Sequence, residues 1–226
     1  INELSGENFY IDGFTIESDQ GFGVRSMKLE INNCIFTKFC NRNSIYFSYC
    51  NLNIKNSSFI SNMLENSNLI KIMNSDVELK NCNFVSNICF RELIICHSNS
   101  NVLVDECNFE SNNISSIIST YKYNNFVEII NSDFSSNNFN GRYRNSCLNI
   151  SLDSSAIVRN CTMKYNYFED DGSLIFTQDD SDMIIEDCQL TDNWFENEFC
   201  GIQINHRSKL TLTDSEICGN YSFKSF

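Results

Sequence analysis

The chain has 226 residues and carries 29 Asp and Glu against 16 Lys and Arg, a formal net charge of −13. Nucleic acids and anionic membrane surfaces are therefore poor partners, because they would meet a surface of their own sign. No apolar run approaches the roughly 18 residues of a membrane span, and no signal peptide is recognisable, so we expect a soluble mature product or fragment without membrane insertion.

A repeated segment runs along the chain. Each copy has an apolar-x-apolar strand, then Asn or Asp, then Cys or Ser, and two residues later a large apolar residue; the clearest copies close with Asn. In chain order the copies begin at Phe9 (a degenerate copy), Leu29, Leu52, Val77, Val102, Val127, Ala156, Met183 and Leu210. Successive starts are 20 to 29 residues apart. A period of this size is typical of stacked units that contact only their neighbours, so the sequence predicts a solenoid.

The alternation inside a copy indicates strands. Val77 and Leu79 point to one side and Glu78 and Lys80 to the other, the period of two expected for a strand with one buried face. The strand resumes after the turn, and a further short apolar strand precedes each copy, as at 69–72 and 93–96. Three short strands per coil predict an all-β, single-stranded, right-handed parallel β-helix of about nine coils. We expect one domain over residues 1–226, as a segment of a longer or self-stacking solenoid.

The turn in each copy forms a column of residues that tolerate a left-handed backbone. Glu106 is the exception in this column. The members are Gly13, Asn33, Asn56, Asn81, Glu106, Asn131, Asn160, Asp187 and Asp214. We expect the side chains of Asn33, Asn56, Asn81, Asn131 and Asn160 to form a ladder of hydrogen bonds between coils.

Two further columns are predicted to face inward. The small column contains Phe14, Cys34, Ser57, Cys82, Cys107, Ser132, Cys161, Cys188 and Ser215, and the large column contains Ile16, Phe36, Phe59, Phe84, Phe109, Phe134, Met163, Leu190 and Ile217. Most of these cysteines are expected to pack as free thiols, because in-register neighbours about 4.8 Å apart give a strained bridge. Bridges between Cys82 and Cys107 or Cys161 and Cys188 remain the alternative.

The other cysteines and the histidines give no metal pattern. Cys40, Cys89, Cys200 and Cys218 lie in or beside turns, where disulfides are more favourable than in the small column. No CxxC pair is present, and His97 and His206 stand alone. We therefore expect neither a metal nor another cofactor.

The FISN, FVSN, FESN and FSSN endings of the four clearest copies resemble the repeats of polymorphic outer membrane proteins. The resemblance covers roughly residues 9 to 221. It implies a right-handed parallel β-helix of the pectin-lyase-like type and a role as a surface adhesin. The family's companion GGA-type strand is eroded here to traces at 172–175 and 201–202, which leaves the subfamily open.

The same fold hosts pectate lyases and polygalacturonases, so catalysis is an alternative. Their sites need clustered carboxylates on an outer sheet with a positioned cation. The acidic groups here are 169–171, Asp179 with Asp180 and Asp182, and Glu186 with Asp187, and the first two read as solvated turns. No catalytic signature of those enzymes is present. We expect no catalysis, with a polysaccharide lyase or hydrolase as the alternative and a phage or virus fibre domain as a third.

Two sets of surface residues are candidates for modification or binding. Five Asn-x-Ser/Thr sequons make Asn113, Asn149, Asn220, Asn56 and Asn160 candidate N-glycosylation sites, of which we favour the first three by position. The column after the closing asparagine carries Tyr167, Trp194 and Tyr221 on successive coils. Such a ladder can bind a sugar face or another protein; alternatively, the rings cover the coil corner.

The sequence therefore predicts a secreted, non-catalytic structural or adhesive protein of the cell surface. Its expected partners are other surface proteins, N-linked glycans, a carbohydrate ligand, and copies of itself. Solenoids ordinarily end in a capping element, and none is visible at either end of this sequence. We accordingly expect head-to-tail assembly into a surface fibre as one mode of action.

Overall fold

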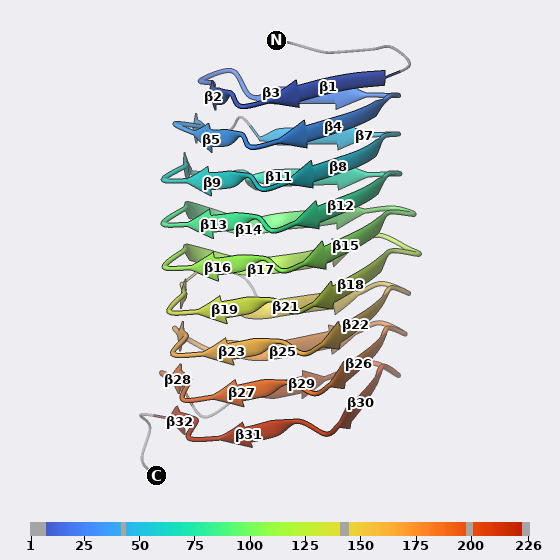
Figure 1. The fold of residues 1–226 in the computed structure, drawn as a ribbon. Helices are drawn as coiled ribbons and strands as arrows, with labels where there is room; N and C mark the ends of the chain where they lie inside the picture. The colour runs from blue at the N-terminus through green and yellow to red at the C-terminus, as the bar shows by residue number, and fades with distance from the viewer. Residues whose placement is uncertain (1–7, 42–43, 141–144, 198–200, 223–226) are drawn as a thin grey trace.

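The computed structural model describes residues 8–41, 44–140, 145–197 and 201–222. Every regular element in these ranges is a β-strand, and each coil runs in turn through three sheets, here called B, C and A (Figure 1). Each strand pairs in parallel with its counterpart from the neighbouring coil. The predicted parallel β-helix with three strands per coil is confirmed. No helix able to span a membrane occurs in the described ranges.

Sheets B and C each contain nine strands, one per coil, and sheet A contains 14 because several coils cross it as two short strands. Sheet B consists of β1 (Asn8–Asp12), β4 (Lys28–Asn32), β8 (Asn51–Lys55), β12 (Asp76–Lys80), β15 (Asn101–Asp105), β18 (Phe126–Ile130), β22 (Ser155–Arg159), β26 (Asp182–Glu186) and β30 (Lys209–Thr213). Sheet C consists of β2 (Thr15–Glu17), β5 (Ile35–Thr37), β9 (Ser58–Ile60), β13 (Asn83–Val85), β16 (Asn108–Glu110), β19 (Asp133–Ser135), β23 (Thr162–Lys164), β27 (Gln189–Thr191) and β31 (Glu216–Cys218). Sheet A consists of β3 (Phe22–Arg25), β6 (Cys40–Asn41), β7 (Ile45–Ser48), β10 (Met63–Leu64), β11 (Ile70–Met73), β14 (Ile88–His97), β17 (Asn113–Tyr121), β20 (Asn138–Phe139), β21 (Ser146–Ser151), β24 (Tyr167–Phe168), β25 (Ser173–Gln178), β28 (Trp194–Phe195), β29 (Ile202–Ile204) and β32 (Tyr221–Ser222).

The corner between sheets B and C is the predicted turn column. All nine of its residues have a positive φ, from 49° to 73°, and Glu106 adopts the same conformation as its neighbours. Amide side chains link several of these corners, for example Asn81 Nδ2 to Asn56 Oδ1 at 2.8 Å and Asn160 Nδ2 to Asn131 Oδ1 at 2.8 Å. We call Asn33, Asn56, Asn81, Asn131 and Asn160 the exposed asparagine ladder.

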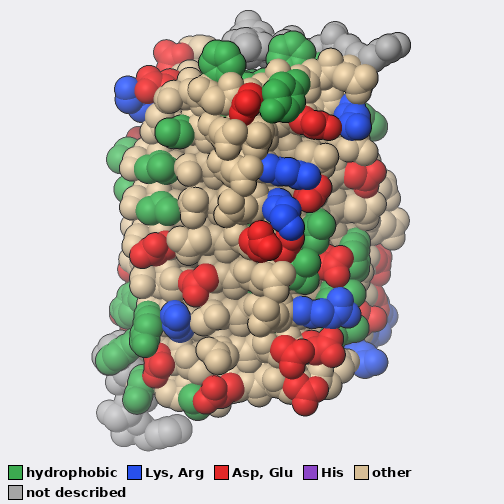
Figure 2. All heavy atoms as spheres, in the orientation of Figure 1, with side chains coloured by type: hydrophobic (Ala, Val, Ile, Leu, Met, Phe, Trp, Pro, Cys, Tyr) green, Lys and Arg blue, Asp and Glu red, His purple; other side chains and the backbone are tan. Residues whose placement is uncertain are grey.

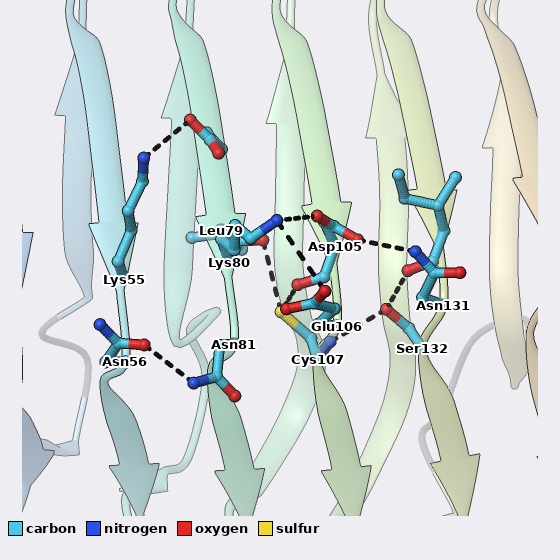
Figure 3. Close-up of polar contacts among 12 residues, drawn as sticks. Lys55, Asn56, Leu79, Lys80, Asn81, Asp105, Glu106, Cys107, Asn131 and Ser132 are labelled. Carbon is cyan, nitrogen blue, oxygen red and sulfur yellow. Dashed lines mark hydrogen bonds and ion pairs between the residues drawn. The ribbon is translucent and has the colours of Figure 1, made fainter.

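Glu106 interrupts the exposed asparagine ladder, and its neighbours are rearranged around it (Figure 3). Asn131 Nδ2 donates to Asp105 Oδ1 at 3.0 Å, one residue before the corner, as Asn56 Nδ2 donates to Asn32 Oδ1 at 2.9 Å. Lys80 Nζ donates to Asp105 Oδ2 at 2.6 Å and lies 4.0 Å from a Glu106 carboxylate oxygen. The polar contacts between coils therefore continue, but through an ion pair in place of an amide.

A second column of asparagines follows the corner between sheets C and A. The corner residues Lys38, Ser61, Ser86, Ser111, Ser136, Tyr165, Asp192 and Gly219 again have positive φ, from 54° to 64°. The residues after seven of them form what we call the buried asparagine ladder: Asn62, Asn87, Asn112, Asn137, Asn166, Asn193 and Asn220. Sequence reasoning recorded these asparagines only as the end of each copy.

In each inner residue of the buried asparagine ladder, both the oxygen and the nitrogen of the side-chain amide form hydrogen bonds. Asn112 Oδ1 accepts from the backbone N–H and from Nδ2 of Asn87, both at 2.9 Å. Its own Nδ2 donates to the Phe84 carbonyl at 2.8 Å and to Asn137 Oδ1 at 3.0 Å. Because these groups are buried, the amide satisfies donors and acceptors that no water can reach.

The small inward column explains why Cys and Ser interchange. Ser57 Oγ donates to the Lys55 carbonyl at 2.7 Å, and Cys161 Sγ donates to the Arg159 carbonyl at 3.1 Å, so both residue types bridge the corner in the same way. All of the column's cysteines are buried free thiols. The predicted free packing of Cys34, Cys82, Cys107, Cys161 and Cys188 is thus confirmed.

Two of the turn cysteines, Cys89 and Cys218, form no disulfide, so the preference for disulfides at these two positions is wrong. Cys89 is buried, and burial raises the pKa of its thiol to about 12. Cys218 is exposed and is a free thiol. Cys200 lies outside the described residues.

The core is built on stacked phenylalanines. Phe36, Phe59, Phe84, Phe109 and Phe134 are fully buried, with successive ring centroids 4.5 to 4.8 Å apart and nearly parallel. A second stack, which the sequence reasoning did not identify, joins Phe139, Phe168 and Phe195 in sheet A at 4.4 and 4.8 Å. Burying each such side chain contributes roughly 1.5 to 3 kcal/mol.

The predicted inward columns hold for the inner coils and fail at the outermost ones. Phe14 is 62% exposed and Ile217 is 47% exposed, because no other described coil covers them. Ile16 is partly buried against the core. The position of a residue in the repeat therefore predicts whether its side chain is buried only in coils that are covered on both sides by a neighbouring coil.

Candidate ligand-binding surface

The aromatic ladder predicted from the sequence lies on the outer face of sheet A. Strand pairing places Tyr167, Trp194 and Tyr221 in register on three successive coils. Trp194 is 42% and Tyr221 is 54% exposed, while Tyr167 is half-buried. The ring centroids of Trp194 and Tyr221 are 5.3 Å apart with an interplanar angle of 38°. The two outer rings therefore present apolar surface to solvent.

The backbone beneath the ladder is rigidly held. The residue after each of Tyr167 and Trp194 is an inward phenylalanine of the second stack, Phe168 or Phe195. The backbone N–H of Trp194 donates to the Asn166 carbonyl at 2.8 Å, so the ladder directly follows the buried asparagine ladder. The spacing of the rings is thus fixed by the strand separation of about 4.8 Å.

Carboxylates flank the aromatic rings. Glu169 and Glu196 each lie two residues beyond a ladder residue, and Glu196 Oε2 accepts the Asp170 backbone N–H at 3.1 Å. Burial, together with the nearby Glu196 and Glu169 charges, raises the pKa of the Tyr167 hydroxyl. The Tyr167 hydroxyl is thus a hydrogen-bond donor in the neighbourhood of two carboxylate acceptors. Aromatic faces combined with carboxylates are groups that suit a hydroxylated, partly apolar ligand such as a sugar.

Three of the acidic residues considered as catalytic candidates make hydrogen bonds within the fold. Asp180 makes two hydrogen bonds to Arg207, which hold the pKa of its carboxyl below the ordinary value. Asp179 accepts from Gln178 at 2.7 Å, and Glu186 accepts from Arg159 at 2.9 Å. In the described part of the chain, no group of three or more His, Cys, Asp or Glu side chains is arranged to hold a metal ion.

The solvent exposure of the five sequon asparagines does not follow the preference predicted from the sequence. Asn56 and Asn160 are exposed, although their amides belong to the exposed asparagine ladder. Asn113 and Asn149 are partly buried in sheet A, and the side-chain oxygen of each is buried without a hydrogen bond. Asn220 is a rung of the buried asparagine ladder and accepts from Asn193 Nδ2 at 2.9 Å. Accessibility therefore favours Asn56 and Asn160, the two positions that sequence reasoning ranked last.

Comparisons with known proteins add little to this geometry. No model of a protein family matches the chain, and no curated protein matches it. Solved structures that align with it include a trypsin-treated variant of QnrB1, a plasmid-mediated fluoroquinolone resistance protein (13% identity, 71% of this chain and 84% of that chain, TM-score 0.26). HetL, a pentapeptide repeat protein from Nostoc sp. strain PCC 7120, aligns at 10% identity over 95% of this chain and 86% of its own, with a TM-score of 0.24. At such TM-scores neither family nor function follows from the likeness. The fold itself defines the class of the protein, a parallel β-solenoid repeat protein.

Proposed function

We propose that this chain is a non-catalytic adhesive β-helix of the cell exterior that binds carbohydrate along the aromatic ladder. The observation that carries the proposal is the exposed, in-register pair Trp194 and Tyr221 beside Glu196. Exposed aromatic rings on a soluble domain need a reason, and sugar stacking provides one. The resemblance of the FxxN repeats to polymorphic outer membrane proteins supports an adhesive role.

The proposal is tested by measuring the affinity of the wild type and of the Trp194→Ala variant for neutral oligosaccharides. We expect at least about tenfold weaker binding, equivalent to about 1.4 kcal/mol, because the ring supplies the largest stacking surface. Tyr123→Ala is the matched control, since Tyr123 is 60% exposed and lies off the ladder. Unchanged affinity in the Trp194 variant, or no neutral glycan bound by the wild type, would refute the sugar-binding assignment.

The absence of catalysis is part of the same proposal. The purified chain should leave neutral and acidic polysaccharides intact, with or without Ca²⁺. Turnover that disappears in an Asp179→Asn, Asp180→Asn double variant would instead establish a polysaccharide lyase or hydrolase. A variant that stays folded, as judged by its melting curve, makes that outcome unambiguous.

The extracellular location is supported by the two exposed sequons. Asn56 and Asn160 present their side chains at the surface, where a glycan has room. Intact mass of the protein purified from its native source, before and after deglycosylation, tests the location. Loss of mass at either site supports passage through the secretory route, whereas identical masses would remove this support.

Head-to-tail assembly is a second candidate function, favoured by the apolar residues on the outermost coils. Continuing the strand register would place Leu212 of one copy over Ile11 of the next, and Ile217 over Ile16. Filaments with an axial repeat near 40 Å, from nine coils at about 4.8 Å, would support it in electron microscopy. A monodisperse monomer by light scattering at physiological salt would exclude it.

A further inference from the structure

A polar groove lies on the outer face of sheet A, in its N-terminal half. It has a volume of about 650 Å³ and lies over β3, β7 and β11 and the loops beside them. Its lining includes Lys71 and Arg91 but no Asp or Glu. The aromatic ladder belongs to later coils, so the two surfaces are separate.

The two cations that line this groove have no ion pair with a carboxylate in the described part of the chain. Seven Lys and Arg side chains have a carboxylate within 4.0 Å: Lys28, Lys38, Lys55, Lys80, Arg159, Lys164 and Arg207. These lie on sheets B and C or at corners, and the view of sheets B and C shows Lys and Arg beside Asp and Glu (Figure 2). Among the described residues, no such ion pair occurs for Arg25, Lys71 and Arg91 of sheet A, nor for Lys122 at a corner and Lys209 on sheet B. A chain with a net charge of −13 thus keeps unpaired cations at a groove.

The walls of the groove suit a saccharide. Tyr46 forms one wall, with Lys71 Nζ 6.0 Å from its ring centroid, and Gly23 beside it in register has no side chain to fill the space. The rim carries hydroxyls and amides, including Ser44 and Ser67, which hydrogen-bond to each other. Aromatic, hydroxyl and amide groups around a cation are the set that an acidic sugar ring requires.

One carboxylate is hydrogen-bonded to a residue of the groove lining, Asn68. Glu92 Oε2 accepts from Asn68 Nδ2 at 2.5 Å, and Glu92 does not line the groove. Burial, and then the charges of Lys71 and Lys122, lower the pKa of His97 to about 4. His97 lies on β14 in register with Met73, two residues beyond Lys71.

We propose that this groove binds an anionic saccharide, with Lys71 and Arg91 holding its carboxylate or sulfate group and Tyr46 contacting the apolar face of a ring. Two cations in the lining, together with uncharged hydrogen-bonding groups, select a charged substituent on a hydroxylated body. The inference goes beyond the proposed sugar-binding ladder and does not depend on it, because no residue is shared.

Binding measurements on the full chain test the groove with a sulfated heparin hexasaccharide, a carboxylated hexagalacturonate and neutral maltohexaose. At physiological ionic strength we expect the wild type to bind at least one anionic probe more tightly than the neutral one. The double variant Lys71→Gln, Arg91→Gln should lose at least about tenfold in affinity for that probe. Which anionic probe binds better distinguishes sulfate from carboxylate recognition.

A matched control is Lys28→Gln, Lys38→Gln, which removes the same charge at exposed positions outside the groove. Its affinity should equal that of the wild type, and both double variants should keep the wild-type melting temperature. An equal loss in the control, no binding of either anionic probe, or equally tight binding of poly-glutamate would each overturn the proposal. Trp194→Ala should leave anionic binding unchanged, so failure of the ladder and failure of the groove are distinguishable.

Discussion

The two asparagine ladders use one residue type with nearly the same period and differ in what holds them together. In the exposed ladder, Asn81 makes one amide hydrogen bond in solvent and is selected by its backbone, with a φ of 50°. In the buried ladder, Asn112 is 1% exposed, and its amide makes four hydrogen bonds. The left-handed residue there is Ser111, one position earlier.

The difference teaches that a repeated asparagine has two separate physical meanings. Glu106 replaces an asparagine of the exposed ladder, and the corner keeps its conformation. The buried ladder runs from Asn62 to Asn220 with no substitution, since any other side chain would leave buried backbone groups without partners. Tolerance to substitution follows burial, although the spacing is the same.

The largest expected effect is on the buried ladder. Asn112→Ala removes the acceptor for the Asn87 N–H and the donor to the Phe84 carbonyl, and each buried group left unpaired costs about 1 to 3 kcal/mol. We expect a loss of about 3 to 6 kcal/mol in the free energy of unfolding, measured by urea denaturation. Asn81→Ala is the comparison and should lose only about 1 kcal/mol. Equal losses in the two variants would contradict the distinction.

A similar loss in the free energy of unfolding is expected when a large side chain is removed from the core beside the buried asparagine ladder. Phe84→Ala keeps the carbonyl that accepts from Asn112 but removes a ring stacked on Phe59 and Phe109. The cavity should cost about 3 to 5 kcal/mol, because the neighbouring coils cannot close around it. An unchanged melting curve would show that the ring does not face inward.

A smaller gain is expected in the exposed ladder. Glu106→Asn replaces a residue that disfavours a positive φ and restores an amide between Asn81 and Asn131, so it should stabilise by about 0.5 to 1 kcal/mol. Glu106→Gln removes the same charge without the backbone preference and is the control. If both variants gain equally, charge and not conformation determines the effect.

The smallest expected effect is a pH dependence of stability at Asp105, beside the point where Glu106 interrupts the exposed asparagine ladder. Burial alone raises the pKa of Asp105, but the Lys80 and Asn131 hydrogen bonds and the Lys80 charge outweigh it and lower the pKa below its ordinary value. The stabilisation is therefore complete above about pH 4 and is lost as the pH falls through the folded-state pKa. Melting temperatures from pH 7 to 2.5 should fall more for the wild type than for Asp105→Asn. Parallel curves would refute the assignment.

Structural features that recur at the same position of every coil can be predicted from the sequence. The turn column, Phe84 and its stacked neighbours, and the register of Trp194 with Tyr221 all follow from one alignment of the copies. The corner at Ser111 escapes notice because serine has no strong preference for a positive φ, so only the chain path reveals it. The groove escapes for another reason: Lys71 and Arg91 lie in segments of unequal length, and stacking of coils brings them together.

The register of the coils has a consequence for how such a chain changes over generations. Copies beginning at Val77, Val102 and Val127 are 25 residues apart, and each offers the next coil the same columns of phenylalanine and buried asparagine. Duplicating or deleting one such unit alters only the junctions, because contacts are limited to adjacent coils. Length is therefore a trait that can vary in whole-coil steps of about 4.8 Å, and lineages can adjust the reach of the molecule without redesigning its interior.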